Sequence, residues 1–245
     1  MAEKPRFYDA TVTQIISLTP TVKHFVLEYP SEADTRFIAG QFMMVHLEKD
    51  GKPHKKPYSI ASSPSLGNKI ELCIKLVEGG YVSNWFFGLK VGDVIHTSIP
   101  YGVFVMREPW QDNLIFVGTG TGIAPLRGMI QNLYEKGCTK NIWLIFGNRY
   151  ETDVLYQSEW EEIARKHKNF HFIPTVSRPK IWTGETAYVQ EIVKKLFAGH
   201  LPAGQAEMEA LDFYGCGLVP MCQQLKATLI EMNIPRERIH FEQFT

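Results

Sequence analysis

Residues 114–125 read Leu114-Ile115-Phe116-Val117-Gly118-Thr119-Gly120-Thr121-Gly122-Ile123-Ala124-Pro125. An apolar run typical of a buried strand is followed by alternate glycines and then by a helical pattern. Glycine turns tightly and lets a phosphate approach the backbone, while the positive end of the following helix favours an anion. The stretch therefore predicts a strand, a turn and a helix that bind a pyrophosphate. The spacing is not G-x-G-x-x-G, because Ile123 stands where the third glycine would be.

After Pro109 the patterns of strand and helix alternate. The apolar runs expected as strands are residues 114–117, 142–146, 170–176, 211–214 and 239–241. Helical patterns lie between them, including a capping-box pair at Ser158 and Glu161 and a last helix opened by Pro220. Five strands with intervening helices predict an α/β domain with a doubly wound parallel sheet.

The first half of the chain has a different pattern, in which short β-rich runs are separated by turn residues. The expected strands are residues 8–18, 24–28, 41–47, 56–61, 69–76 and 94–99, with one brief helix over 82–89. Many short strands with turn signals favour a small antiparallel β-barrel. The sequence therefore predicts two domains, residues 1–107 and 108–245.

The composition excludes several classes of protein. Lys plus Arg and Asp plus Glu both number 26, which argues against a nucleic-acid binder that relies on net charge. No apolar run approaches the roughly 18 residues that span a bilayer, and the charged N-terminus lacks the apolar core of a secretory signal. The four cysteines, Cys73, Cys138, Cys216 and Cys222, lack zinc-site or iron–sulfur spacing, so no metal site is expected. Reduced thiols in a cytoplasm are the expectation.

An ordered set of motifs in the first half carries a family resemblance. The set comprises Lys56-Pro57-Tyr58-Ser59, then Lys75, then Gly80-Tyr81-Val82-Ser83, then Pro100-Tyr101-Gly102-Val103-Phe104. It resembles the flavin motif of the ferredoxin–NADP reductase family, R-x-Y-[ST], a basic residue, G-x-x-[ST] and a variant of G-x-x-G-x-F. The resemblance covers essentially the whole chain. It implies an FAD-binding barrel followed by a nicotinamide-binding α/β domain, without a fused iron–sulfur domain.

The resemblance also implies roles for these residues. Tyr58 would lie against the isoalloxazine, and the Ser59 hydroxyl would reach flavin N5, the atom that accepts hydride. Lys56 and Lys75 would meet the pyrophosphate charge, and the backbone amides from Gly80 through Val82 to Ser83 would hold the same phosphates. Pro57 belongs to the same cofactor-binding motif. Lys56 stands where the family usually has arginine. The lysine keeps the positive charge but lacks the bidentate fork of a guanidinium group.

Three segments of the second half resemble family motifs. Cys216-Gly217-Leu218-Val219-Pro220-Met221 is similar to C-G-x-x-x-M, which would place Cys216 beside nicotinamide C4 with Gly217 and Met221 lining the site. Glu242 matches the family's catalytic glutamate near the C-terminus. Phe244 matches the flavin-shielding terminal aromatic, although it is not the last residue, and core packing is the alternative.

The nicotinamide cofactor is expected to be NADPH rather than NADH. By resemblance, Ser177-Arg178 and Arg149 would bind the 2′-phosphate, and no acidic residue is obviously placed to bind a ribose diol. NADH stays open as the alternative, because Ser-Arg-Pro also occurs in relatives that resemble oxygenase reductases.

These features favour an enzyme that transfers hydride from NADPH to FAD and single electrons to a ferredoxin or flavodoxin. The basic segment 52–56 either receives such an acidic partner or is a solvated loop. The alternatives are an NADH-dependent oxygenase-type reductase, a free-flavin reductase on the same fold, and a non-catalytic electron-relay subunit of a larger complex.

Overall fold

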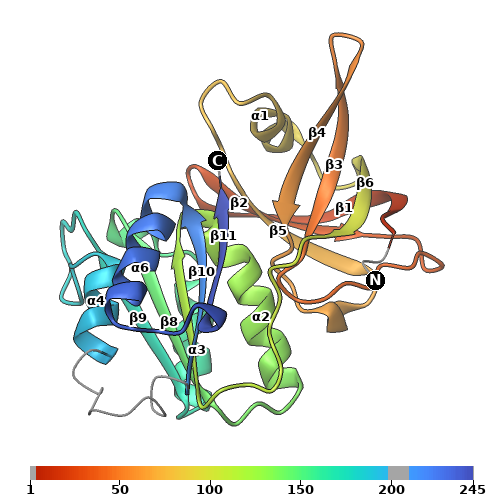
Figure 1. Cartoon of the computed structure of the whole chain (residues 1–245). Coiled ribbons are helices and arrows are strands. Elements are labelled where there is room, and N and C mark those ends of the chain that lie inside the picture. Colours follow the sequence, from red (N-terminus) through yellow and green to blue (C-terminus); the bar gives the residue numbers. More distant parts are fainter. Residues whose placement is uncertain (1–3, 198–209, 245) are drawn as a thin grey trace. The chain divides into compact units, whose positions relative to one another are not determined.

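The computed structural model describes residues 4–197 and 210–244. The chain divides into two compact units, residues 1–106 with 127–136, and residues 107–126 with 137–245. Each unit is built on its own sheet (Figure 1). Within the described ranges, no helix is long and apolar enough to cross a membrane.

The first unit is a six-stranded antiparallel sheet with the order β4-β3-β6-β1-β2-β5. Its strands are β1 (Arg6–Thr19), β2 (Val22–Glu28), β3 (Phe42–Lys49), β4 (Lys52–Ser59), β5 (Lys69–Lys75) and β6 (Val94–Tyr101). The sheet curls until its two edges approach each other, because Ile60 and Leu72 form an antiparallel bridge and the Ala61 N–H donates to the Glu71 carbonyl at 2.8 Å. The predicted antiparallel barrel is confirmed in this curled form.

The helix α1 (Tyr81–Gly88) packs its apolar side on the core of this unit. Phe86 is fully buried, and its ring contacts Phe25 of β2 at a centroid distance of 5.3 Å. Burial of these side chains is the main stabilising contribution, since each large apolar residue contributes about 2–3 kcal/mol. It also fixes the first turn of α1 next to the end of β5.

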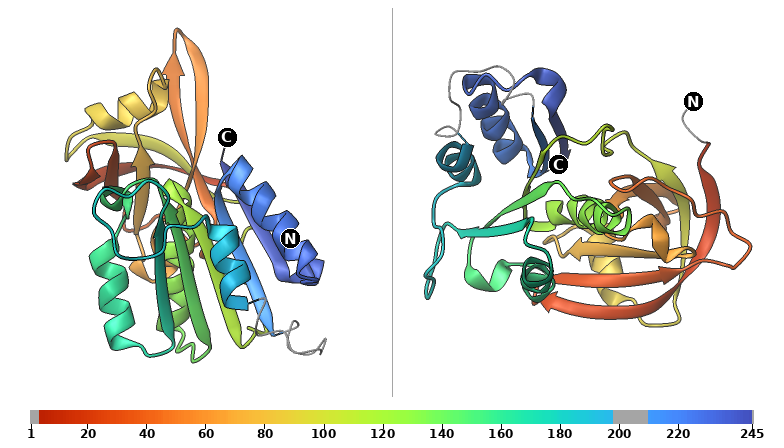
Figure 2. Two further views of the ribbon diagram at one scale, coloured as in Figure 1. Left: turned by 90° about the vertical axis from the view of Figure 1, so that its left-hand side faces the viewer. Right: turned by 90° about the horizontal axis from the view of Figure 1, so that it is seen from below.

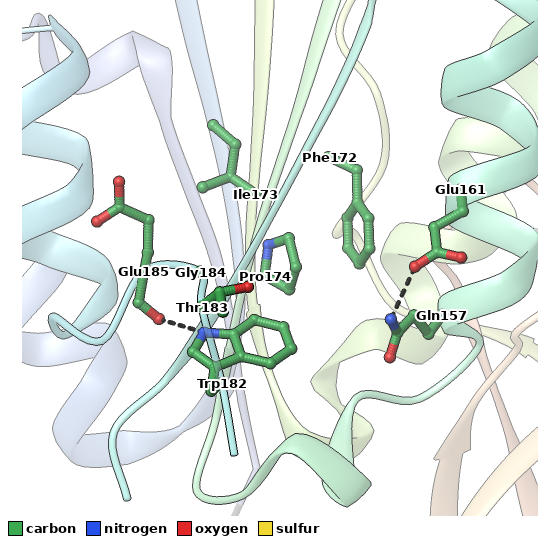
Figure 3. Close-up of a pocket in the computed structure, with 9 residues that line it drawn as sticks. All are labelled: Gln157, Glu161, Phe172, Ile173, Pro174, Trp182, Thr183, Gly184 and Glu185. Carbon is green, nitrogen blue, oxygen red and sulfur yellow. Dashed lines mark hydrogen bonds between the residues drawn. The ribbon is translucent and has the colours of Figure 1, made fainter. Parts of the chain in front are cut away.

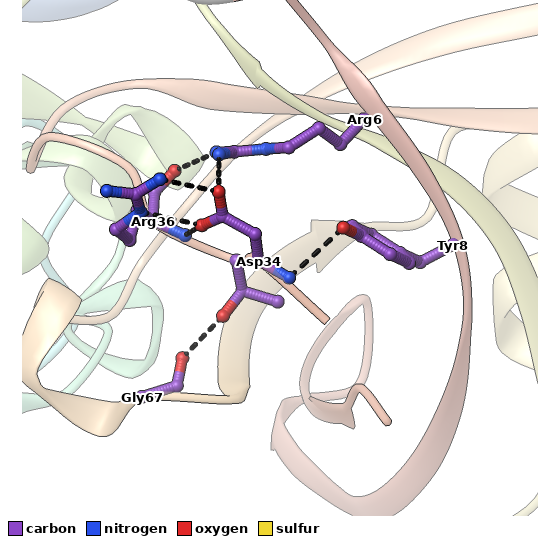
Figure 4. Close-up of polar contacts among 6 residues, drawn as sticks. Arg6, Tyr8, Asp34, Arg36 and Gly67 are labelled. Atoms are coloured by element: carbon purple, nitrogen blue, oxygen red, sulfur yellow. Dashed lines mark hydrogen bonds and ion pairs between the residues drawn. The ribbon is translucent and has the colours of Figure 1, made fainter. Parts of the chain in front are cut away.

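Ion pairs and hydrogen bonds hold the connection between β2 and β3 (Figure 4). The Asp34 carboxylate accepts hydrogen bonds from Arg36 Nε at 2.8 Å and from Arg6, and its backbone N–H donates to the Tyr8 hydroxyl at 3.0 Å. The hydrogen bond from Arg36 is the main cause that keeps the pKa of Asp34 well below its usual range. Thr35 donates to the Gly67 carbonyl at 2.9 Å, which ties the connection to the turn before β5.

The hairpin between β3 and β4 differs from the sequence expectation. The strand β4 begins at Lys52 rather than at residue 56, so the basic segment 52–56 lies in an edge strand and is not a loop. Asp50 and Gly51 have φ angles of 53° and 71°, as a tight Asp-Gly hairpin requires. Pro53 is tolerated there because an edge strand leaves one side of its backbone without a partner.

The second unit is a parallel sheet with the order β11-β10-β7-β8-β9. Its strands are β7 (Asn113–Thr119), β8 (Asn141–Asn148), β9 (Phe170–Val176), β10 (Leu211–Leu218) and β11 (Ile239–Phe244). The helices are α2 (Ile123–Glu135), α3 (Gln157–Lys166), α4 (Val189–Phe197) and α6 (Val219–Glu231). The helix α2 begins in this unit, but its residues from 127 onward group with the first.

Helices cover both faces of the parallel sheet, and Figure 2 shows α3 on one side with α4 and α6 on the other. Trp160 of α3 lies beside Phe170 and Phe172 on one face of β9. On the opposite face, α4 and α6 share a core with apolar side chains of β7, β8 and β10. This arrangement confirms the predicted doubly wound domain. Ligands of such sheets bind beyond the carboxyl ends of the strands.

Two local expectations in this unit are wrong. The helix α3 has Tyr156 at its N-cap in a left-handed conformation, with φ of 58°, so Ser158 lies inside the first turn and forms no capping box. The strand β10 does not end at residue 214 but continues to Leu218. Cys216 therefore lies within a central strand rather than in a loop after it.

Candidate functional site

The predicted phosphate turn lies at the carboxyl end of β7. Gly118 and Thr119 end the strand, and Gly120, Thr121 and Gly122 form a short 3₁₀ turn that leads directly into α2. Gly120 has a φ of 54°, which glycine adopts without strain. A Cβ at Gly122 would collide with the carbonyl group of Cys216. The turn therefore needs glycine to pack on β10, and Gly120 and Thr121 stay partly exposed.

Thr119 supports binding of a polar ligand at this turn. Its Oγ1 atom is buried and has no hydrogen-bond partner within the described parts of the chain. A Cβ at Gly217 would collide with this hydroxyl and lie 2.8 Å from the Met221 methyl group. A buried hydroxyl without a partner is unfavourable unless a ligand or water satisfies it. The residues present thus fit a nicotinamide nucleotide.

Three predicted residues form a row across neighbouring strands. Cys216 on β10 is paired with Gly118 on β7 and with Glu242 on β11, and Leu218 is paired with Phe244 at the end of β11. Cys216 is fully buried, whereas Glu242 and Phe244 are half-buried. Burial, and next to it the charge of Glu242, raises the pKa of the Cys216 thiol well above its usual value. The thiol is thus suited to packing against a ligand rather than to nucleophilic attack.

The predicted 2′-phosphate residues lie together at the ends of β8 and β9. The Arg178 N–H donates to the Arg149 carbonyl at 2.8 Å, and the Ser177 N–H donates to the Asn148 carbonyl at 3.0 Å. Both arginine side chains are exposed. Two arginines on backbone segments that are bonded to each other supply positive charge of the kind that binds phosphate.

The second predicted group belongs to the first unit and surrounds the end of β4. Lys56 and Pro57 are exposed, Tyr58 is half-buried and Ser59 is buried. The Tyr58 ring packs edge-on against Phe86 of α1, with ring centroids 4.9 Å apart. Burial raises the pKa of the Tyr58 hydroxyl, so this group stays protonated at neutral pH.

The connection from β5 to α1 holds the other predicted flavin-site residues. Lys75 ends β5 and is exposed, and Gly80 is the N-cap of α1. The Ser83 hydroxyl accepts a hydrogen bond from the Val77 N–H at 3.1 Å, so its side chain stabilises the turn. The Val82 side chain is buried in the core, which leaves its backbone N–H as the group that can serve a ligand. The first-turn N–H groups of α1 are an anion-binding arrangement.

An aromatic pocket beside this turn is missing from the sequence prediction. It has a volume of about 470 Å³ and is lined by Gly79, Gly80, Tyr81, Asn84 and Trp85. The Tyr81 hydroxyl donates to the Glu48 carbonyl at 2.6 Å, and His54 of β4 meets the Tyr81 ring edge-on. The spacing of Tyr81 and Trp85, four residues apart on a helix, could have indicated such a surface.

A further pocket of about 420 Å³ lies in the second unit (Figure 3). Trp182 lines it with Phe172 and Pro174 of β9, and its indole N–H donates to the Glu185 carbonyl at 2.9 Å. The Val176 N–H also donates to the Glu185 carbonyl, at 2.9 Å, so the segment around Trp182 is attached to the edge of β9. This attachment shapes the chain that follows Ser177 and Arg178.

Each half of the chain matches a known domain family. Residues 9–106 match the oxidoreductase FAD-binding domain family, and residues 116–227 match the oxidoreductase NAD-binding domain family. The chain is 30% identical to ferredoxin–NADP reductase B of Sorangium cellulosum over 97% of both chains. The chain belongs to the ferredoxin–NADP reductase family. It is also 32% identical to the phenol 2-monooxygenase reductase component DmpP of Pseudomonas sp., over 97% of this chain and 65% of that protein.

Solved structures share the fold. A cytochrome P450 reductase of Amycolatopsis, GcoB, matches all of this chain and 71% of its own, with a TM-score of 0.87 at 23% identity. A ferredoxin NADP+ reductase from Neisseria gonorrhoeae with bound FAD and NADP matches 97% of this chain and 98% of its own, with a TM-score of 0.82 at 22% identity. The chain is thus an oxidoreductase with an FAD-binding unit and a nicotinamide-nucleotide-binding unit.

Proposed function

We propose that the chain is an NADPH-dependent FAD reductase that delivers electrons to a ferredoxin or a flavodoxin. The observation that carries the choice of NADPH is the backbone hydrogen bond between Arg178 and Arg149, which joins the two segments that bear these exposed arginines. A 2′-phosphate carries the negative charge that distinguishes NADPH from NADH, and paired arginines bind phosphate well. Ser177 adds a hydroxyl beside them.

The first unit holds FAD in this proposal. The Tyr58 ring packs on the isoalloxazine, and Lys56 and Lys75 neutralise the pyrophosphate, aided by the N–H groups at the start of α1. The bridge between Ile60 and Leu72 supports this grouping, because it joins the two edges of the sheet, and Lys56 and Lys75 lie four and three residues from it along the chain. When bound, FAD accepts a hydride at N5 and passes electrons on singly.

The remaining site residues orient the reactants. The Ser59 hydroxyl exchanges a hydrogen bond with flavin N5, Cys216 packs beside nicotinamide C4 as a neutral thiol, and Glu242 is the catalytic carboxylate beside Cys216. Gly118 through Gly122 and Gly217 leave room for the nicotinamide nucleotide, with Met221 at its margin. Rate enhancement by such a site comes mainly from positioning.

The edge strand β4 supports the choice of an acidic electron acceptor. Lys52, Lys55 and Lys56 are exposed on this strand. Lysines on a defined strand give a positive surface that steers an acidic carrier protein and raises the association rate at low salt. The fall of the reduction rate with ionic strength would test this part of the proposal.

A second candidate is an NADH-dependent reductase of an oxygenase system. The 32% identity to the phenol 2-monooxygenase reductase component favours it. Anaerobic addition of NADPH or NADH to the purified protein distinguishes the two. Faster bleaching of the flavin absorption by NADPH supports the first candidate, faster bleaching by NADH supports the second, and a protein that neither retains nor reduces FAD contradicts both.

A further inference from the structure

Arg127 on α2 makes an unusual set of buried contacts within the first unit. Its side chain is 10% exposed, and one nitrogen, Nη1, donates to the Ala61 carbonyl at 2.8 Å and to Glu71 Oε2 at 2.5 Å. Ala61 lies two residues after Ser59. A buried guanidinium that bonds a backbone carbonyl and a carboxylate together restrains both of them.

Glu71 connects the same segment from the other side. Its backbone carbonyl accepts from the Ala61 N–H at 2.8 Å, and its own N–H donates to the Ser62 hydroxyl at 3.1 Å. His24 Nε2 lies 3.7 Å from Glu71 Oε1, on the side of the carboxylate away from the Arg127 contact to Oε2. Both peptide groups of Ala61 are therefore held, the N–H by Glu71 and the carbonyl by Arg127.

Three more contacts join α2 to the residues after Ser59. The Ser63 N–H donates to Gln131 Oε1 at 3.1 Å, and the Ser63 hydroxyl donates to Glu135. Gly128 is in close contact with the Ser62 carbonyl, which a Cβ would approach to 2.5 Å. Arg127, Gln131 and Glu135 are four residues apart, so one face of the helix follows the chain from Ala61 to Ser63.

The segment from Ser59 to Ser63 is consequently fixed at nearly every residue. Ser59 is buried, the Ile60 N–H donates to the Gln41 carbonyl at 3.0 Å, and the next two residues are held by Glu71. A displacement of Ala61 would therefore be transmitted to Ser59 through a short, restrained chain. Replacement of a buried ion pair by apolar side chains of similar volume often leaves a folded protein equally stable or more stable. Stability alone is therefore a weak reason for the pair of Arg127 and Glu71, and a positioning role is the reason argued below.

We propose that Arg127, with Glu71, is a positioning residue that sets the place of the Ser59 hydroxyl at flavin N5. The inference rests on the proposed role of Ser59. Arg127 does not touch the flavin in this proposal; it acts through Ala61. Lysine does not replace it, because the lysine side chain is one bond shorter, so its ammonium group falls short of the place where Nη1 contacts both the carbonyl and the carboxylate.

The test uses the full-length protein saturated with FAD. The variants are Arg127→Met, Arg127→Lys and Ser59→Ala, with the double variant Arg127→Lys/Ser59→Ala. The matched control is Arg165→Met, which changes an exposed arginine in the helix α3. Arg127→Lys keeps the buried charge, so it remains informative where Arg127→Met fails to fold.

The first readout is amide hydrogen exchange of residues 60–63, which does not depend on activity. We expect Arg127→Lys to accelerate this exchange about tenfold and Arg165→Met to leave it unchanged, since a restrained segment opens more often when its anchor is lost. Exchange at the wild-type rate in Arg127→Lys would overturn the proposal.

The second readout is the rate of flavin reduction in a single anaerobic turnover at full FAD occupancy. We expect Arg127→Lys to slow it about tenfold, and the double variant to be within about twofold of Ser59→Ala, because groups that act as one unit are not additive. A double variant whose reduction rate falls by the product of the two single effects would overturn the proposal. The proposal would also fail if Arg127→Lys reduced the flavin slowly while Ser59→Ala reduced it at the wild-type rate. If the wild-type protein is not reduced by either nicotinamide cofactor, the proposed function itself fails. If the wild type and Ser59→Ala behave as expected while Arg127→Lys matches the wild type, only the positioning role fails.

Discussion

Cys216 on β10 lies directly opposite Glu242 on β11, in the register of the parallel pair. The neighbouring Cys222 of α6 also contacts this place, because its Sγ lies 3.6 Å from the Glu242 carbonyl oxygen. A thiol in a central strand beside an acidic residue is held neutral by burial and by the nearby negative charge. This environment opposes a thiolate and favours a thiol that packs against its ligand.

Cys216 is therefore expected to resist alkylation in the native protein. Iodoacetamide at pH 8 reacts with thiolates. Because the pKa of Cys216 is raised, almost none of this thiol is ionised at pH 8, and its full burial also keeps the reagent away. Mass spectrometry after brief treatment, with the urea-unfolded protein as the positive control, measures the labelling. Rapid native labelling of Cys216 would contradict its assignment as a neutral packing group.

Removal of the same thiol should separate catalysis from flavin binding. We expect Cys216→Ala to slow flavin reduction by about tenfold to a hundredfold, because misplacement of a reactant by about 1 Å has effects of this size. The content of bound FAD should stay at the wild-type level. Cys138→Ala, a buried cysteine elsewhere in the second unit, is the matched control and should not change the rate.

Tyr58 is expected to hold FAD through its ring more than through its hydroxyl. Loss of one stacking ring weakens binding of a flat heterocycle by about tenfold to a hundredfold, so Tyr58→Ala should be purified largely without flavin. Tyr58→Phe keeps the ring and its contact with Phe86 and should retain most of the flavin. FAD released per protein, measured by absorption after denaturation, tests this, and full occupancy in Tyr58→Ala would remove the residue from the site.

The fold follows from local patterns that act over short distances along the chain. The apolar run before Gly118 and the glycines after it predict a strand and a tight turn, and the structure has β7 and η2 (Gly120–Gly122) there. The alternation of strand and helix predicts the parallel sheet, because two parallel neighbouring strands must be joined by a crossover, which is usually a helix. The order of the flavin motifs along the chain indicates the family, and the resemblance to the family then indicates the expected site residues.

The expectations that fail depend on partners far away in sequence. β10 extends through Gly215 and Gly217, which are weak strand formers, because β11 pairs with both of them and β7 pairs with Gly215 and Cys216. Pro53 marks a turn in a local reading, yet it lies in β4 because that strand is at the sheet edge. The contact of Arg127 with Ala61 spans 66 residues of sequence, and no local pattern can indicate it.

Arg149 and Arg178 are expected to separate NADPH from NADH. A hydrogen bond to a charged group contributes about 1.5–3 kcal/mol, so each single alanine variant should raise the KM for NADPH by roughly tenfold to a hundredfold. The KM for NADH, which lacks the 2′-phosphate, should change little. Arg165→Ala serves as the exposed control. Equal losses with both cofactors would assign the two arginines to a general effect rather than to recognition of the phosphate.

Glu71 is expected to link the stability of the first unit to acid pH. Burial by itself would raise the pKa of its carboxyl group, but the contacts with His24 and Arg127 lower it to about 2. Because the folded-state pKa lies below the unfolded value near 4.5, the carboxylate contributes stability that is complete above about pH 4.5 and is lost as the pH falls towards 2. A difference of this size corresponds to about 3 kcal/mol.

Urea unfolding of the wild type and Glu71→Gln at pH 7, 5 and 3 measures this contribution. At pH 7 the variant should be clearly less stable, because it leaves the buried Arg127 without its carboxylate. The gap between the two proteins should narrow at pH 3, because Glu71 is then largely protonated in the unfolded wild type while the folded state still keeps it charged. Glu162→Gln is the control, because its exposed pair with Lys166 should add little at any of the three pH values. A gap that stays constant from pH 7 to pH 3 would show that the charge of Glu71 contributes no stability, and that its side chain acts only by filling space beside Arg127.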